Sequence, residues 1–125
     1  MKVAELMQTS LRTISTDATI GDAAVAFAEA QVSALPVLDR LGRAVGVVST
    51  REILRAESQR RSEHTLVLEI MMPWPLTVSP DLDVRQAAQE MLYLNVQRLF
   101  VEYDGALVGV ISQTDIVAAV GAAKV

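Results

Sequence analysis

The sequence contains one pattern twice, and this repeat constrains the fold more than any other feature. When residues 3–38 are shifted by 64 positions, the second half of the chain aligns with the first. One residue is lost near Asp39–Leu41, and the shift then becomes 63. Two such copies, each of about 53 residues, can pack about a pseudo-twofold axis, which would place their equivalent loops across a shared cleft. The identical pairs are Val3/Val67, Glu5/Glu69, Met7/Met71, Thr13/Thr77, Ser15/Ser79, Asp17/Asp81, Ala23/Ala87, Ala24/Ala88, Val32/Val96, Leu35/Leu99, Val37/Val101, Gly42/Gly105, Val45/Val108, Gly46/Gly109, Val47/Val110, Ser49/Ser112, Ile53/Ile116 and Ala56/Ala119.

The size of the chain limits how the copies can be arranged. With 125 residues, it suits one compact domain or two very small ones. A single repeat would bury too little surface to be comfortably stable, so we expect the two copies to share a core. Hydrophobic residues make up 51% of the sequence and charged residues 21%, which is typical of a globular protein rather than a disordered one.

Composition also excludes several classes of function. The sequence has no cysteine, so it has neither a disulfide framework nor a thiolate metal site. Its net charge of −4 disfavours a broad nucleic-acid surface, which needs many cations to replace counterions. The apolar runs at 23–28 and 116–123 are too short to span a bilayer, and the N-terminus shows no signal-peptide core. We therefore expect a cytoplasmic protein without membrane or nucleic-acid contacts.

Each repeat is predicted to form a strand, a helix, two strands and a second helix, so the fold class is mixed α+β. The first repeat has an expected extended segment at 12–15, a helix after Thr19, strands at 34–38 and 43–48, and a helix at 50–56. The second has an extended segment at 76–79, a helix after Asp83, strands at 98–103 and 106–111, and a helix from 113 toward 120. Asp104-Gly105 is a typical hairpin turn between the last two strands.

The first helix of each repeat has an alanine-rich apolar face. Such faces are consistent with close helix packing between two copies of the chain, but they can equally face the internal core. The side chains concerned are Ile20, Ala23, Ala24, Phe27 and Ala28 in one helix and Val84, Ala87, Ala88, Met91 and Leu92 in the other.

The most polar stretch of the chain is residues 57–64, between the two repeats. A polar segment without apolar periodicity is typical of a surface linker. The sequence therefore predicts a first domain at 1–58, a linker at 59–66 and a second domain at 67–125.

The strongest local motif is a glycine, two apolar residues, a serine, two variable residues and an acid. It occurs at 46–52, ending in Glu52, and again at 109–115, ending in Asp115. The serine falls where a buried strand gives way to a helix, and the free N–H groups of a helix N-terminus favour an anion. The acid lies in the first turn, where it can accept hydrogen bonds from a ribose diol. The alternative is a simple capping box, which needs no ligand.

Taken in order and twice, these motifs resemble the cystathionine-β-synthase (CBS) domain family, and the whole chain resembles a stand-alone CBS domain pair, or Bateman module. The matching pieces are residues 32–37, the two glycine-to-acid motifs, and the Thr-x-Ser-x-Asp stretches at 13–17 and 77–81. The resemblance covers about residues 3–120. It implies two units related by a pseudo-twofold axis, each β-α-β-β-α, packed sheet to sheet as one module.

The resemblance also implies a site for an adenosine-containing ligand, such as AMP, ADP, ATP or S-adenosylmethionine, in the cleft between the units. Asp115 would bind the ribose hydroxyls, and Val110 would touch the base. Ser112, Thr114 and Arg98 would contact phosphate or ribose. From the first unit, Ser33 and Ala34 would contact the ligand, and the backbone at Arg12 would line the base pocket. A second, mirror-related site would use Val47, Ser49, Arg51 and Glu52, where glutamate stands in place of the usual aspartate.

Three functions are to be compared for such a sequence. The first is a regulatory module that senses the adenosine ligand, requires no other cofactor, forms a homodimer and acts on an effector protein that the sequence does not identify. The second is a homodimeric scaffold that needs no ligand, in which the two motifs are only helix caps. The third, an enzyme, is disfavoured because no nucleophile–base pair, metal cluster or phosphate-binding glycine loop is present in the sequence.

Overall fold

The computed structural model describes residues 1–124 and divides the chain into two compact units. One unit is Arg12–Pro75. The other combines Met1–Leu11 with the chain from Leu76 onward. The compact units therefore differ from the two repeats of the sequence, because the opening segment of each repeat belongs to the unit built mainly from the other.

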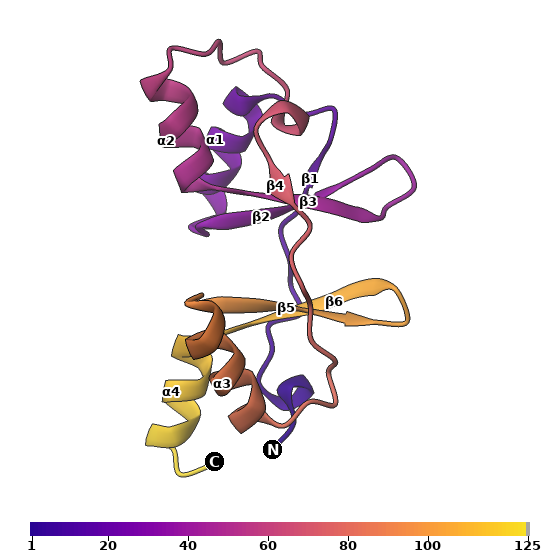
Figure 1. The fold of residues 1–125 in the computed structure, drawn as a ribbon, viewed down its shortest axis with the longest axis vertical. Helices are drawn as coiled ribbons and strands as arrows, with labels where there is room; N and C mark the ends of the chain where they lie inside the picture. Colours follow the sequence, from indigo (N-terminus) through magenta and orange to yellow (C-terminus); the bar gives the residue numbers. More distant parts are fainter. Residues whose placement is uncertain (125) are drawn as a thin grey trace. The chain divides into compact units, whose positions relative to one another are not determined.

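The unit Arg12–Pro75 is a four-stranded sheet with two helices on one side (Figure 1). Its strands lie in the order β1-β2-β3-β4, with β1 parallel to β2 and the other pairs antiparallel. The helices contact each other, and α2 also contacts β3. The elements are β1 (Ile14–Ser15), α1 (Ile20–Ala30), β2 (Ala34–Leu38), β3 (Ala44–Ser49), α2 (Thr50–Ser58), the 3-10 helix η2 (Val67–Glu69) and β4 (Met72–Pro73).

The other unit repeats this plan with a smaller sheet. The antiparallel strands β5 (Arg98–Tyr103) and β6 (Ala106–Ser112) are extended by single bridges from Val78 to Val101 and from Gln8 to Val110. Helix α3 (Val84–Leu94) contacts β5, and α4 (Gln113–Gly121) contacts both α3 and β6. The 3-10 helix η1 (Val3–Glu5) completes the unit. No helix within residues 1–124 has the length and apolar character needed to cross a membrane.

Each unit has a core of its own, and each core is completed by a valine from the opening segment of the other repeat. Val3 is fully buried among the side chains of α3, β5 and β6, while Val67 is fully buried among those of α1, β2 and β3. Backbone hydrogen bonds hold both segments in place: the Val3 N–H donates to the Leu82 carbonyl, and the Val67 N–H donates to the Ala18 carbonyl, both at 2.8 Å. The expected shared core is thus two cores, joined by an exchange of segments.

The polar segment 59–66 lies within the Arg12–Pro75 unit rather than between the compact units. The carbonyls of Glu63 and Thr65 accept hydrogen bonds from the N–H groups of Gly21 and Ile20. These bonds satisfy donors in the first turn of α1 that have no partner within the helix. The chain passes from one unit to the other at residues 11–12 and 75–76 instead.

Local signals fixed the helices at the predicted residues. Thr19 and Asp22 form a reciprocal capping box at the start of α1, and Asp83 caps α3. Both helices end at a residue in the left-handed region, Gln31 and Asn95, which are 64 positions apart. The repeat in the sequence is therefore a repeat in backbone geometry.

The buried helix faces differ in part from the expected ones. Ala26 is buried in α1, whereas Ala24 and Ala28 are exposed, and Leu92 in α3 is 83% exposed. The buried stripe is shifted around the helix from the apolar pattern, because Ala24 and Ala28 lie on one side of Phe27 and the buried Ala23 and Ala26 lie on the other. The alanine-rich faces consequently point partly to the core and partly to the surface.

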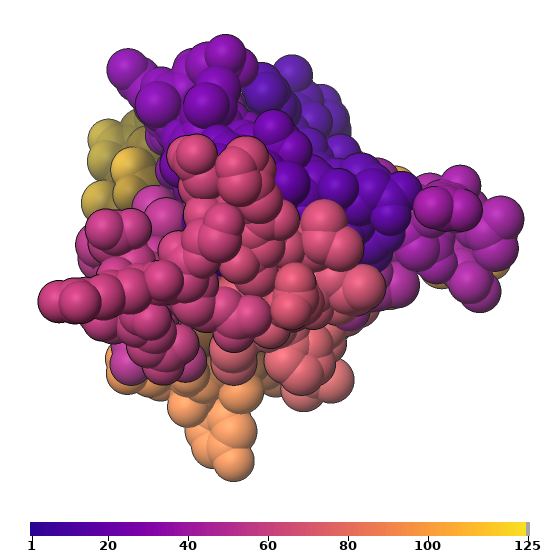
Figure 2. Space-filling view, turned by 90° about the horizontal axis from the view of Figure 1, so that it is seen from above, coloured from indigo at the N-terminus to yellow at the C-terminus, as the bar shows by residue number. Residues whose placement is uncertain are grey.

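The two hairpins differ at their turns. Asp104 and Gly105 both have positive φ, as the two-residue type I′ turn requires, which confirms the predicted hairpin. The loop between β2 and β3 is longer and projects from the body of its unit (Figure 2). Asp39 holds this loop together: hydrogen bonds from the backbone N–H groups of Arg43 and Leu41 lower the pKa of its carboxyl group.

Gly46 lets β4 approach β3 closely, and we expect Gly46→Ala to destabilise the protein by about 1–3 kcal/mol. An added Cβ would lie 2.6 Å from the Met72 carbonyl oxygen and 2.5 Å from the Met71 sulfur, so the strand itself would have to move. Chemical denaturation measures the effect. Gly121→Ala is the control: its Cβ would meet no atom within 4 Å, and the change should be neutral or slightly stabilising. Equal stability of the two variants would contradict the prediction.

Candidate functional site

Ser112 and Asp115 form a capping box at the junction of β6 and α4. The Ser112 hydroxyl accepts a hydrogen bond from the Asp115 N–H at 3.1 Å, and Asp115 Oδ2 accepts one from the Ser112 N–H at 2.9 Å. Both side chains are half-buried. The helix-cap interpretation of this motif is therefore correct as far as it goes. It does not exhaust the carboxylate, because two ionised oxygens offer about four lone-pair positions.

Gln8 adds a third contact to Asp115 that sequence reasoning missed. Its side-chain amide donates to Asp115 Oδ1 at 3.3 Å. The backbone of Gln8 also bonds to Val110 in both directions, at 2.8 and 3.0 Å, which fixes the segment beside β6. No repeat identity marks Gln8, since its counterpart in the aligned sequence is Met72. The contact arises only from the exchanged opening segment.

Arg98 lies opposite Ser112 in the β5–β6 ladder. Directly opposed residues of antiparallel strands place their side chains on the same face of the sheet, with Cβ atoms roughly 4.5–5.5 Å apart. Within residues 1–124 the Arg98 guanidinium has no hydrogen bond or ion pair. Thr114 is exposed one residue before Asp115. The junction thus combines a carboxylate, a serine at a helix N-terminus and an uncommitted cation, a set suited to hydroxyl groups and an oxyanion.

The equivalent junction of the Arg12–Pro75 unit has the same cap but different chemistry. Glu52 Oε1 accepts hydrogen bonds from both the N–H and the hydroxyl of Ser49, at 2.6 and 2.9 Å, and Glu52 is only 6% exposed. Its extra methylene is folded back onto the cap instead of extending the carboxylate outward. Ala34 lies opposite Ser49, where the other unit has Arg98. This junction therefore lacks a cation opposite its serine, and its arginine, Arg51, lies in the first turn of α2 instead.

The predicted site residues divide between the two compact units. Val110, Ser112, Thr114, Asp115 and Arg98 belong to the unit completed by Met1–Leu11, and the structure places them at one strand–helix junction.

The remaining predicted residues lie in Arg12–Pro75. There the Ser33 carbonyl accepts the Thr50 N–H at 3.2 Å, which holds the start of α2 against the start of β2. The guanidinium of Arg12 pairs with Glu29 at 3.2 Å. Val47 is half-buried in β3, and Arg51 is exposed in the first turn of α2. Residues 1–124 contain no cluster of three or more histidine, aspartate or glutamate side chains that could hold a metal.

A family model, curated relatives and solved structures all relate this chain to proteins with CBS domains. The family model for the CBS domain matches residues 3–59 and 67–122. The CBS domain-containing protein YhcV of Bacillus subtilis is 30% identical over 91% of this chain and 81% of its own length. Several other curated relatives are longer proteins, of which the chain spans 14–42%.

Two solved structures show the same fold. The CBS domain protein PAE2072 of Pyrobaculum aerophilum, complexed with AMP, is 32% identical and superimposes with a TM-score of 0.83 over 92% of this chain and 89% of that one. The CBS domain pair of protein MJ0100, in complex with 5-methylthioadenosine and S-adenosyl-L-methionine, is 25% identical with a TM-score of 0.86 over 99% and 98%. With both repeats matched by the family model and the fold shared throughout, the chain belongs to the CBS domain family and is a tandem pair of CBS domains.

Proposed function

We propose that this CBS pair is a regulatory module that binds an adenosine-containing ligand at the β6–α4 junction. The observation that carries the proposal is the grouping of Asp115, Ser112 and Arg98 at one junction, in a chain 32% identical to a CBS protein complexed with AMP. Asp115 would accept hydrogen bonds from the ribose hydroxyls. Ser112, Thr114 and Arg98 would bind phosphate, and Val110 would contact the base.

Isothermal titration with AMP, ADP, ATP and S-adenosylmethionine tests the proposal. We expect saturable heat with at least one of these ligands and a rise in melting temperature, because a ligand that binds only the folded state stabilises it. We expect a stoichiometry near one ligand per chain. The β3–α2 junction should not take up AMP, since Glu52 is only 6% exposed and Ala34 stands where the other junction has Arg98. Absence of both heat and thermal shift at millimolar ligand would refute the proposal.

The role of Arg98 gives a selective prediction. Arg98→Ala should weaken AMP binding by about tenfold, because one charge-assisted hydrogen bond to phosphate is lost. Binding of 5-methylthioadenosine, which carries no phosphate, should change by less than about twofold. Competition titration measures both affinities. Arg40→Ala, which removes an exposed arginine from the β2–β3 loop, is the control and should change neither. Equal losses for both ligands would contradict a phosphate role for Arg98.

Regulation also requires a partner, and we propose a second copy of this chain. Exposed apolar side chains lie on the outer surfaces of α3 and α4, including Leu92, Val117 and Val120. Between these helices runs a groove of about 250 Å³ whose lining includes Ala88 and Ile116. Covering such side chains removes apolar area from water. Light scattering should give twice the monomer mass, and a monomer at every concentration would refute the dimer.

We further propose that the module acts by changing conformation and not by catalysis. The ligand would favour one state through differential affinity, and that shift would be read by an effector protein. The junction offers hydrogen-bond acceptors, donors and a cation, which are groups for holding a ligand. The net charge of −4 argues against nucleic acid as the partner.

A further inference from the structure

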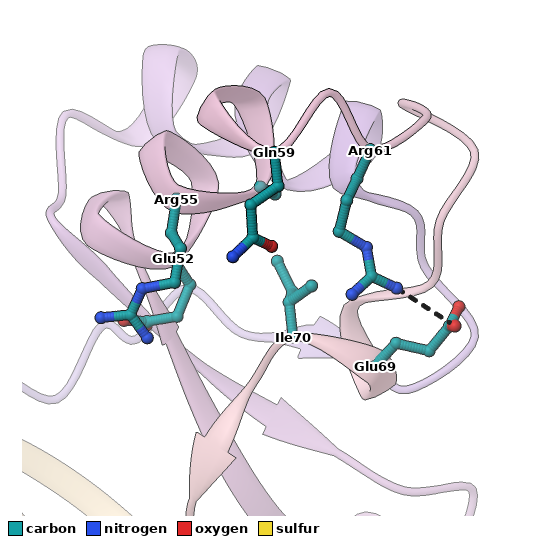
Figure 3. A pocket seen from close by; sticks show the side chains of 7 residues that line it. Glu52, Arg55, Gln59, Arg61, Glu69 and Ile70 are labelled. Carbon is teal, nitrogen blue, oxygen red and sulfur yellow. Dashed lines mark hydrogen bonds and ion pairs between the residues drawn. The ribbon is translucent and has the colours of Figure 1, made fainter.

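A polar pocket lies in the Arg12–Pro75 unit, between α2 and η2 (Figure 3). Its volume is about 170 Å³, enough for several water molecules or a small anionic group. Arg55 and Gln59 project into it from α2, and Arg61 projects from the turn that follows the helix. Ala56 and Ile70 contribute apolar lining, and Glu52 and Glu69 complete it.

Most of the unused hydrogen-bonding capacity in this pocket consists of donors. Glu52 already accepts two hydrogen bonds from Ser49. Glu69 accepts one from the Arg61 side chain at 3.4 Å and one from the Leu66 N–H at 3.2 Å. By contrast, the Arg55 guanidinium has no hydrogen bond or ion pair within residues 1–124, and Arg61 uses one of its five donors. Such a site is complementary to an acceptor-rich group.

Two polar side chains of the pocket, Arg55 and Gln59, are not repeated in the other half of the sequence. Helices α2 and α4 end alike: Arg60 and Ala123 both have left-handed φ, and the next N–H in each case bonds back to the helix. The backbones therefore correspond, but the side chains do not. Arg55, Gln59 and Arg61 correspond to Ala118, Ala122 and Lys124. The two helix ends have the same backbone geometry, which therefore does not explain why Arg55 and Gln59 stand where the other repeat has alanines.

We propose that the α2–η2 pocket is a separate binding site for a small oxyanion, either a phosphate or a carboxylate group. Arg55 and Arg61 approach the pocket from two sides, where they balance the charges of Glu52 and Glu69 and supply guanidinium donors, and Gln59 supplies a further N–H donor (Figure 3). Guanidinium groups are suited to this because their planar N–H forks match both phosphate and carboxylate oxygens. The site does not depend on adenosine binding at the β6–α4 junction.

Titration of isotope-labelled protein with inorganic phosphate, and separately with acetate, tests the proposal at constant ionic strength kept with chloride. We expect at least one anion to give saturable amide shifts in residues 55–61 and 69–70, and the comparison tells phosphate from carboxylate chemistry. Arg55→Ala combined with Gln59→Ala copies the side chains of the other repeat. It should weaken binding by about tenfold or more.

Two control variants make the result decisive. Arg60→Asn removes a neighbouring positive charge at a left-handed position that asparagine tolerates, and it should change the affinity by less than about twofold. Arg98→Ala should leave these shifts unchanged, which separates this pocket from the proposed adenosine site. Shifts that rise linearly with both anions, or an equal loss with Arg60→Asn, would overturn the proposal.

Discussion

Val3→Asp is expected to unfold the unit that contains residues 76–124, although Val3 belongs to the opposite repeat. Val3 is fully buried in the core formed by α3, β5 and β6. A carboxylate there would lack any partner, and the loss should be at least about 4 kcal/mol. That is a large share of the stability of a domain this small. Val67→Asp should have the reciprocal effect on Arg12–Pro75, since Val67 is fully buried in that core.

Amide hydrogen exchange followed residue by residue measures this prediction. Val3→Asp should remove protection first from β5, β6 and α3, and Val67→Asp first from β2, β3 and α1. Leu41→Asp is the control: this side chain is 77% exposed in the β2–β3 loop, so the change should stay within about 0.5 kcal/mol. If Val3→Asp instead loosened β2 and β3, the exchange of segments would be wrong.

The elements of this fold were predictable because their signals are local. Strands β2 and β5 have the predicted bounds, and the caps of all four α-helices were read from single residues. Thr19 with Asp22 is an example. Each side chain accepts a hydrogen bond from the backbone N–H of the other residue, three positions away. The repeat then confirmed each element by its counterpart. The two-residue strand β4 and the 3-10 helices η1 and η2 were not predicted, because such short elements give no pattern of their own.

The exchange of opening segments could not be predicted for a physical reason. Val3 and Val67 are identical and occupy equivalent pockets, so either valine would bury the same area in either core. The repeat establishes that they are equivalent but not which core each one enters. The contact from Gln8 to Asp115 depends on that choice, and it was therefore hidden as well.

Differences between the repeats carry more functional information than their identities. The identical residues mostly build cores, caps and turns, as Ser49 and Ser112 show by capping equivalent helices. Two differences fall at the junctions where strand meets helix: Arg98 stands against Ala34, and Asp115 against Glu52. Two domains with one fold can thus carry two unlike junctions, and the junction of β6 and α4 is the one that we propose for a phosphate-bearing ligand.

Asp115→Ala is expected to weaken AMP binding by about a hundredfold, and this change separates the sensor from the scaffold interpretation. The ribose hydroxyls would lose two charge-assisted hydrogen bonds to the Asp115 carboxylate, worth about 3 kcal/mol together. Titration calorimetry measures the affinity. The protein should also lose about 1 kcal/mol of stability, because Asp115 helps to cap α4. A ligand-independent scaffold would show only this loss of stability.

Two matched variants assign the effect to the ligand. Asp115→Asn keeps an oxygen that can accept the Ser112 N–H, so stability should be nearly unchanged while AMP affinity still falls. Asp22→Ala removes the carboxylate of the equivalent capping box at α1 and should cost similar stability without changing affinity. If Asp115→Ala and Asp22→Ala behaved alike toward AMP, the acid would be a cap and nothing more. If only Asp115→Ala lost binding, a residue that helps to cap a helix would also be the residue that recognises the ribose.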